Sequence, residues 1–309
     1  MESTVMPVAN APCSFGVDEI LPEGCWMPEP DEILDWMVQL DYVGTELGAV
    51  GFMGDGKVAR DRMAKRGLAL IGAFLPQRFT HPECVDEDRA WLRDSLALLR
   101  ESTPEGSAPF AILSDGLDEE VRLRNSGRID EHPEARLTPA RLDTLVSNLH
   151  RAAEICREAG FEAVIHPHAG TWVETAGEID ALMNRVDPSL VGLCLDTGHF
   201  RFGGADPTAA VHAYHALTRH VHLKECSVAV LDEIRDAGQG FPAAVERHVF
   251  TVLGDGDTGI PQVLDALREH DYRGWLVVEQ DNFLGDRDTK ASIVEDQRRN
   301  REYLRSLGV

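Results

Sequence analysis

Cysteine pairs are missing from this sequence. Its six cysteines lie far apart, and no two of them form a Cys-X-X-Cys motif. Isolated cysteines fit reduced thiols better than a disulfide framework or a structural zinc site. We therefore expect the thiols to behave as small buried hydrophobes. They are Cys13, Cys25, Cys84, Cys156, Cys194 and Cys226.

Positive charge is also scarce. The chain has 30 Lys and Arg residues against 53 Asp and Glu residues, which gives a formal net charge of -23. No basic block offsets this charge locally, so the chain repels phosphate backbones and anionic membrane surfaces. We expect a small-molecule partner, with no nucleic-acid partner and no membrane partner.

Long apolar runs, repeats and a glycine-rich phosphate loop are absent as well. No stretch approaches the length of a membrane span, and Met1-Glu2-Ser3-Thr4 has neither the cationic nor the apolar region of a signal peptide. A cytoplasmic location is the expectation. The segment 11–16 after the first β-branched run is not the glycine-rich loop that an open doubly wound sheet requires.

Eight short β-branched runs are present, and helical periodicity follows them. This alternation is typical of βαβ units around a parallel sheet, and eight strands close a barrel. With 309 residues, 43% of them hydrophobic, the chain can bury the core of one such domain. We predict a single-domain (β/α)₈ TIM barrel over 1–309 of the α/β class. The predicted strands are 5–12, 42–48, 68–76, 109–114, 161–167, 190–196, 220–225 and 274–281.

Helices are predicted between these strands, and two connections are unusually long. The long connections, 115–138 and 226–259, each follow a strand, so both should lie on the catalytic face of the barrel. Thr175 with Glu178 forms a capping box, and Asp206-Pro207 marks another helix start. The predicted helices are 32–40, 86–101, 139–159, 176–185, 207–217, 261–270 and 291–307.

Four late strands end in residues that bind metals or move protons. Any one of these has an ordinary explanation, such as a helix cap, but four consecutive strand ends of this kind indicate a site. Mixed oxygen and nitrogen ligands suit Mn²⁺, Co²⁺, Mg²⁺, Fe²⁺ or Zn²⁺. The strand ends read Val-Ile-His166-Pro-His168, Cys-Leu-Asp196-Thr-Gly-His199, Val-His222-Leu-Lys224-Glu225 and Val-Val-Glu279-Gln-Asp281.

These motifs resemble the xylose isomerase-like barrels, a family that includes sugar epimerases and apurinic endonucleases, over nearly the whole chain. The resemblance implies one divalent metal, expected to be Mn²⁺ or Co²⁺, on Asp196, His222 and Glu279. The first ligand departs from the family pattern, because His166 stands where most relatives have Glu and a carboxylate follows at Glu174. Either His166 takes that ligand position, or Glu174 reaches back and frees His166 for acid–base work.

The segment from His166 to Thr175 resembles the myo-inosose-2 dehydratase branch of this family. That resemblance implies dehydration of a cyclic polyhydroxy ketone such as 2-keto-myo-inositol, by removal of the proton beside the ketone and loss of the next hydroxyl. His168, or whichever of His166 and Glu174 is free, is the expected base. Lys224 either holds a substrate oxygen or protonates the leaving hydroxide, or else it forms a salt bridge to Glu279 or another carboxylate at the rim.

Two further residues join the candidate site. His199 either orients a ligand or touches substrate, and Glu46, at the end of the second strand, either binds substrate hydroxyls or supports a ligand.

Removal of the proton beside a ketone gives an enediolate that the metal stabilises, and two other kinds of enzyme use the same step. They are a ketose isomerase or epimerase, and a 3-keto-glycoside eliminase. A three-metal endonuclease would need a basic groove, which this chain lacks. A non-catalytic scaffold would be expected to have lost its metal-ligating residues. A homo-oligomer, either a dimer or a tetramer, is a further expectation from the family.

Overall fold

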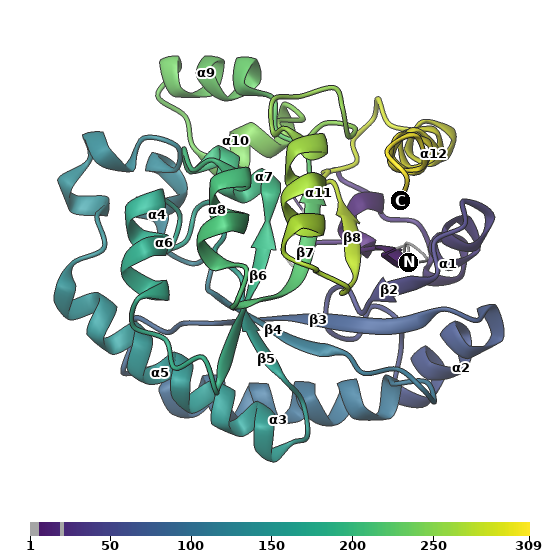
Figure 1. The fold of residues 1–309 in the computed structure, drawn as a ribbon, viewed down its shortest axis with the longest axis horizontal. Helices are drawn as coiled ribbons and strands as arrows, with labels where there is room; N and C mark the ends of the chain where they lie inside the picture. The colour runs from purple at the N-terminus through teal and green to yellow at the C-terminus, as the bar shows by residue number, and fades with distance from the viewer. Residues whose placement is uncertain (1–5, 19–21) are drawn as a thin grey trace.

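Eight parallel strands close into a barrel in the order in which they occur in the chain (Figure 1). The computed structural model describes residues 6–18 and 22–309; the predicted first strand began at Val5, which lies outside them. The single-domain (β/α)₈ barrel predicted from sequence is confirmed. The strands are β1 (Val8–Asn10), β2 (Gly44–Glu46), β3 (Ala69–Gln77), β4 (Phe110–Asp115), β5 (Ala163–Ile165), β6 (Val191–Asp196), β7 (Thr218–Lys224) and β8 (Leu276–Glu279).

The main helices surround the barrel and begin where the sequence offers caps. The Thr175 side chain accepts a hydrogen bond from the backbone of Glu178, and Asp206 caps the helix that Pro207 opens. One helix, α2, was not predicted, because six of its 11 residues are charged and its apolar face is weak. The helices are α1 (Pro30–Gln39), α2 (Gly56–Arg66), α3 (Val85–Ser102), α5 (Pro139–Glu158), α6 (Ala176–Met183), α8 (Pro207–Tyr214), α11 (Ile260–Glu269) and α12 (Lys290–Ser306).

The two long connections contain short helices that the sequence analysis did not predict. The segment 115–138 holds α4 (Glu120–Asn125) and two 3₁₀ turns, and 226–259 holds α9 (Val228–Asp236) and α10 (Phe241–Glu246), which lie at the top of Figure 1. A further short helix, α7 (Thr197–Phe202), follows β6 directly. The second connection has its own hydrophobic cluster, separate from the main core, which includes Phe202, Leu231, Ile234, Phe241 and Phe250.

The register shifts by one residue in two strand pairs beside the site. Thr45 of β2 pairs with Leu70 of β3 but Glu46 pairs with Gly72, and Leu193 of β6 pairs with Thr218 of β7 but Cys194 pairs with His220, so β3 and β7 each contain one extra residue. Such bulges bend a strand and re-aim a side chain. After the second shift, Asp196 stands opposite His222, and Lys224 stands opposite Glu279.

None of the helices within residues 6–18 and 22–309 combines the length and the apolar character that crossing a membrane requires.

A buried ion pair fastens the first long connection to the barrel. Arg122 of α4 is fully buried and donates to both carboxylate oxygens of Glu178 at 2.8 and 2.9 Å. It also donates to the carbonyl of Ala135, and its guanidinium lies over the ring of Trp172. The connection is therefore tied through Arg122 to α6 and to the loop after β5.

We expect Arg122→Ala to lower the free energy of unfolding by about 3–5 kcal/mol, because it leaves the Glu178 carboxylate without its buried partner. Arg124→Ala is the matched control, since Arg124 pairs with Glu120 on the exposed side of the same helix and should change stability by no more than about 0.5 kcal/mol. Urea unfolding of both variants checks this. Equal, small losses would show that the buried pair does not hold the connection.

Candidate active site

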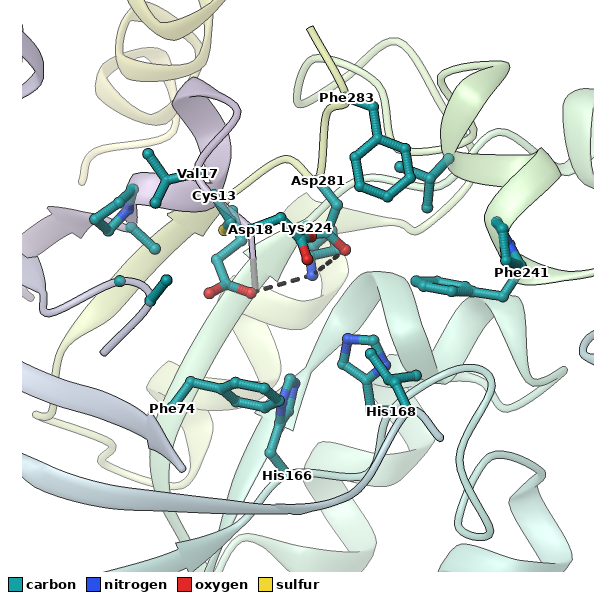
Figure 2. A pocket seen from close by; sticks show the side chains of 18 of the residues that line it. Cys13, Val17, Asp18, Phe74, His166, His168, Lys224, Phe241, Asp281 and Phe283 are labelled. Carbon is teal, nitrogen blue, oxygen red and sulfur yellow. Dashed lines mark hydrogen bonds and ion pairs between the residues drawn. The ribbon is translucent and has the colours of Figure 1, made fainter. Parts of the chain in front are cut away.

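A cavity opens at the carboxyl ends of the strands. Figure 2 shows His166, His168, Lys224 and Asp281 pointing into it, with Phe241 and Phe283 on one side and Phe74 on another. This is the end of the barrel at which enzymes of this fold carry their catalytic residues. The ionisable residues that line the floor are Glu46, His166, His168, Lys224, Glu279 and Asp281.

Four of the predicted ligands form one chain of contacts at this floor. His166 Nε2 lies 3.5 Å from Asp196 Oδ2, and the same oxygen lies 3.5 Å from His222 Nδ1. His222 Nδ1 in turn lies 2.9 Å from Glu279 Oε2. Bonds of about 2.0–2.2 Å to a first-row metal separate neighbouring ligand atoms by about 3.0–3.6 Å. The four side chains therefore have the spacing of a metal's ligands.

Three side chains of this group have buried ligand atoms without hydrogen-bond partners among the described residues. Both ring nitrogens of His166, Oδ2 of Asp196 and Nδ1 of His222 have none among the described residues, although these side chains are at most 3% exposed. Unpaired buried polar atoms are costly and rare in folded proteins. A divalent cation bound among them would satisfy all three side chains, so the donor set fits such an ion.

Glu46 supports this group from below. Its Oε1 lies 3.0 Å from His222 Nε2 and 2.7 Å from Nε2 of His220, a residue absent from the sequence-based site. Since Nε2 of His222 faces Glu46, Nδ1 is left for the other carboxylates. Of the two alternatives for Glu46, the geometry favours support of a ligand. His220 could have been found from its spacing, because His220, His222 and Lys224 share one face of β7.

Lys224 neutralises the carboxylates at the centre of the floor. Its Nζ lies 3.3 Å from Asp196 Oδ2, 3.1 Å from Glu279 Oε2 and 2.9 Å from Asp281 Oδ2. Burial alone lowers the pKa of Lys224, but these carboxylates outweigh it and hold the pKa well above its usual value. The salt bridge considered for Lys224 from sequence is confirmed, and its ammonium also reaches the cavity.

A glycine makes room for the Lys224 side chain. A Cβ at Gly198 would lie 2.5 Å from Cγ of Lys224, so only glycine fits at this position in the Asp196-Thr-Gly-His199 motif. The motif therefore supplies a carboxylate of the four-residue group and the space for a neighbouring cation.

His168 and His199 stack on one another beside the metal-ligand group, with ring centroids 3.7 Å apart. The Nδ1 atom of His168 lies 2.8 Å from the carbonyl of Ala169, so the proton is on Nδ1 and the lone pair on Nε2. His199 Nε2 lies 2.8 Å from Lys224 Nζ. Burial lowers the pKa of both imidazoles well below the usual value, which keeps them neutral.

Glu174 lies apart from this group. One of its oxygens accepts from the backbone of Gly127 at 2.7 Å, and the other accepts from the backbone of Gly170 at 2.6 Å and from the Ser126 hydroxyl. Burial raises the pKa of this carboxyl above its usual value. Both oxygens are thus engaged in joining the loop after β5 to the connection after β4, whereas His166 lies against Asp196. Of the two sequence alternatives, this arrangement favours His166 as the ligand.

Asp281 belongs to the strand-end motif Val-Val-Glu279-Gln-Asp281 but was not among the predicted site residues. It lines the cavity and pairs with Lys224, and burial raises its pKa to about 6. Its spacing of two residues from Glu279 was the available signal, because a strand that continues past Glu279 points both side chains to the same face.

Asp115 ends β4 beneath the loop that carries His168. It is 3% exposed, and one oxygen accepts from the backbone of Trp172 at 3.2 Å while the other has no described partner. Burial raises the pKa of this carboxyl from 3.8 to about 7. The folded protein therefore keeps a proton here that the unfolded chain has already lost at pH 5 or 6.

We expect this proton to make the protein less stable as the pH rises from about 4 to 7, because the folded state binds more protons than the unfolded state throughout that window. Asp115→Asn removes the titration, so the variant should gain stability over the parent across the same window, on the order of 1–4 kcal/mol. Urea unfolding between pH 4 and 8 measures it, with Asp94→Asn on the exposed face of α3 as control. A gain independent of pH would contradict the assignment.

Comparison with known proteins gives matches over most of the chain. The model of the xylose isomerase-like TIM barrel family matches residues 110–307. An inosose dehydratase of Geobacillus kaustophilus (strain HTA426) is 37% identical over 281 residues, which cover 90% of this chain and 89% of that protein.

Solved structures share the fold at low identity. One is the IOLI protein with a binding zinc atom, with a TM-score of 0.72 at 12% identity, covering 98% of both chains. Another is the probable 3-DHS dehydratase AsbF from Bacillus anthracis, with a TM-score of 0.69 at 13% identity, covering 97% of this chain and 99% of that chain.

Proposed function

The chain belongs to the xylose isomerase-like TIM barrel family, and on this premise we propose that it is a metal-dependent hydro-lyase that dehydrates a cyclic polyhydroxy ketone, 2-keto-myo-inositol. The observation that carries the proposal is the buried group of His166, Asp196, His222 and Glu279, in which the first three side chains have described ligand atoms without a hydrogen-bond partner. An inosose dehydratase that is 37% identical over 90% of this chain supports the proposed substrate.

The metal would be held by these four side chains, with Mn²⁺ or Co²⁺ as the proposed ion. Nitrogen and carboxylate ligands suit both ions, and a relative of the same fold contains zinc. When bound, such an ion would polarise the ketone and a neighbouring hydroxyl. This would acidify the C–H bond on the carbon beside the ketone, which lies between the ketone and the carbon that loses its hydroxyl.

His168 is the proposed base. It lines the cavity, and its Nε2 has the lone pair because Nδ1 donates to the carbonyl of Ala169. Its pKa is lowered chiefly by burial, so the imidazole is neutral and can accept the proton beside the ketone. His199 stacks on the same ring and fixes its orientation.

Lys224 is the proposed acid. As the C–H electrons form the new double bond, the bond to the hydroxyl on the next carbon breaks, and the ammonium protonates the departing oxygen, which leaves as water. Asp281 and His199 hold the Lys224 ammonium at 2.9 and 2.8 Å, so the proton donor is fixed in place. The proton on His168 then passes to solvent and Lys224 regains one from solvent, so both groups return to their starting states and the net loss is one water.

We expect metal-free protein to be inactive and protein restored with Mn²⁺ or Co²⁺ to convert 2-keto-myo-inositol to the dehydrated diketone. NMR in deuterated water measures water loss and deuterium uptake together, with a chelated sample as control. Deuterium uptake without water loss would replace the dehydratase by an epimerase. Absence of both, with metal bound, would refute the proposal.

We expect Glu46→Gln to weaken metal affinity about 10–100-fold, because the amide no longer provides the carboxylate that orients His222. Calorimetric titration of metal-free protein with Mn²⁺ or Co²⁺ measures this. Asp115→Asn is the matched control, since it removes another buried carboxylate at a strand end that has no contact with the four ligands, and should leave the affinity unchanged. Equal losses in both variants would mean that general loosening, rather than ligand orientation, lowers the affinity.

A further inference from the structure

A thiol lies directly beneath the four-residue group. Cys194 precedes Asp196 by two residues on β6, so both side chains point into the barrel interior. Cys194 is fully buried and packs with Ile112 and Val164 in a small apolar cluster. It also lies close to the rings of His166 and His222. The thiol is therefore the boundary between the apolar interior of the barrel and the ionisable floor above it.

The thiol is within reach of an ion that these two histidines could hold. Its sulfur and one ring nitrogen from each of His166 and His222 all lie within 4.8 Å of one another. Bonds of about 2.0–2.1 Å to nitrogen and about 2.3 Å to sulfur place such ligand atoms about 3.5 Å apart around one tetrahedral ion. Small side-chain rotations are therefore enough to bring all three atoms onto one ion.

The two histidines have nitrogen atoms free to bind such an ion. Both ring nitrogens of His166 and Nδ1 of His222 have no hydrogen-bond partner within residues 6–18 and 22–309, although these side chains are only 3% and 2% exposed. A buried imidazole with neither nitrogen paired is costly. It indicates a cation as the partner of the ring, and the Cys194 sulfur lies beside it.

The thiol adds no charge to the floor until an ion binds. Burial raises the pKa of Cys194 to about 12, and the nearby His222 opposes this shift without overcoming it. The thiol is therefore neutral at ordinary pH and does not add to the repulsion between carboxylates such as Asp196 and Glu279. A divalent cation stabilises the thiolate, so its binding would release the thiol proton to solvent.

A sulfur donor changes which ions such a group prefers. Carboxylate oxygens suit Mn²⁺ and Mg²⁺, whereas thiolate is a soft donor that favours ions such as Zn²⁺. For a given set of nitrogen, oxygen and sulfur donors, Co²⁺ and Zn²⁺ also bind more tightly than Mn²⁺. A site of two imidazoles, two carboxylates and one thiolate would therefore discriminate against Mn²⁺ more strongly than the same site without sulfur.

We propose that Cys194 is a fifth metal ligand, and that its sulfur makes the site select Co²⁺ and Zn²⁺ over Mn²⁺ and Mg²⁺. This rests on the proposed function, because the ion is the one that the four-residue group would hold. Cys194 is not among the residues that line the cavity. Its sulfur would therefore hold the ion from beneath and leave the cavity side open to the oxygens of the substrate.

The test titrates metal-free protein with Co²⁺ in the absence of oxygen. Calorimetry measures binding, and the thiolate-to-cobalt charge-transfer absorption in the near ultraviolet reports sulfur on the ion. We expect this absorption to reach its maximum at one ion per chain and to be lost in Cys194→Ser. That variant should keep its Mn²⁺ affinity but bind Zn²⁺ at least about tenfold more weakly, because losing a ligand costs at least as much as losing a side chain that only orients one. Cys156→Ser is the matched control, since this thiol is equally buried but lies on α5 in the main core, and it should keep the absorption and the Zn²⁺ affinity.

The outcomes separate this proposal from the proposed function. Co²⁺ binding without the absorption, or equal Zn²⁺ affinities in Cys194→Ser and the parent, would overturn the thiol ligand and leave the dehydratase intact. Absorption lost in Cys13→Ser but kept in Cys194→Ser would place the sulfur donor in the cavity wall after β1 and overturn the assignment. If neither Co²⁺ nor Mn²⁺ binds, the four-residue group and the proposed function fail together with the thiol ligand. Retained Mn²⁺ binding shows that Cys194→Ser is folded, and Cys194→Ala provides the same comparison if the serine variant does not fold.

Discussion

The structure depends on keeping several buried carboxylates close together at one end of the barrel. Glu46, Asp196, Glu279 and Asp281 are all at most 7% exposed, and carboxylates this close repel one another unless cations are among them. Lys224 contacts three of the four, and His222 contacts the remaining one, Glu46. Burial alone lowers the pKa of His222, but Cys194, Glu279 and Glu46 raise it well above the usual value. The two basic side chains of β7 therefore make the acidic floor possible.

The carboxylates and histidines of this floor differ in what they contact and in how their pKa values are shifted. One oxygen of Asp196 accepts from the backbone of His199 and so begins α7, while the other faces His166 and His222. Burial lowers the pKa of His168, and it does so even for His166 and His220, which lie beside Asp196 and Glu46. His222 contacts three carboxylates, and there the charges outweigh burial and raise the pKa.

The barrel and most of the site could be predicted from sequence, because the strand ends carry their chemistry locally. Asp196, His222 and Glu279 each close an apolar run, and alternation along a strand fixes which side chains face inward. The resemblance to xylose isomerase-like barrels is confirmed by the family match. The position of Glu174 could not be predicted, because its partners Ser126 and Gly127 come from a connection whose path depends on the buried pair of Arg122 and Glu178. The apolar side chains that line the cavity, such as Leu117, Phe241 and Phe283, could not be predicted for the same reason, since they come from segments distant in sequence.

The two register shifts have a consequence for how such a site can arise and be lost. Each is, in effect, one extra residue in a strand, and it determines which side chains face the interior from that point onward. Deleting the extra residue of β7, Arg219, would turn the side chains that follow it to the other face of that strand, His220 and His222 among them, and deleting the extra residue of β3, Ile71, would do the same to the part of β3 that pairs with Glu46. Substitution can vary the walls of this cavity one residue at a time. The floor, by contrast, is sensitive to the length of the chain, so an insertion or deletion in these strands removes several of its members in one step.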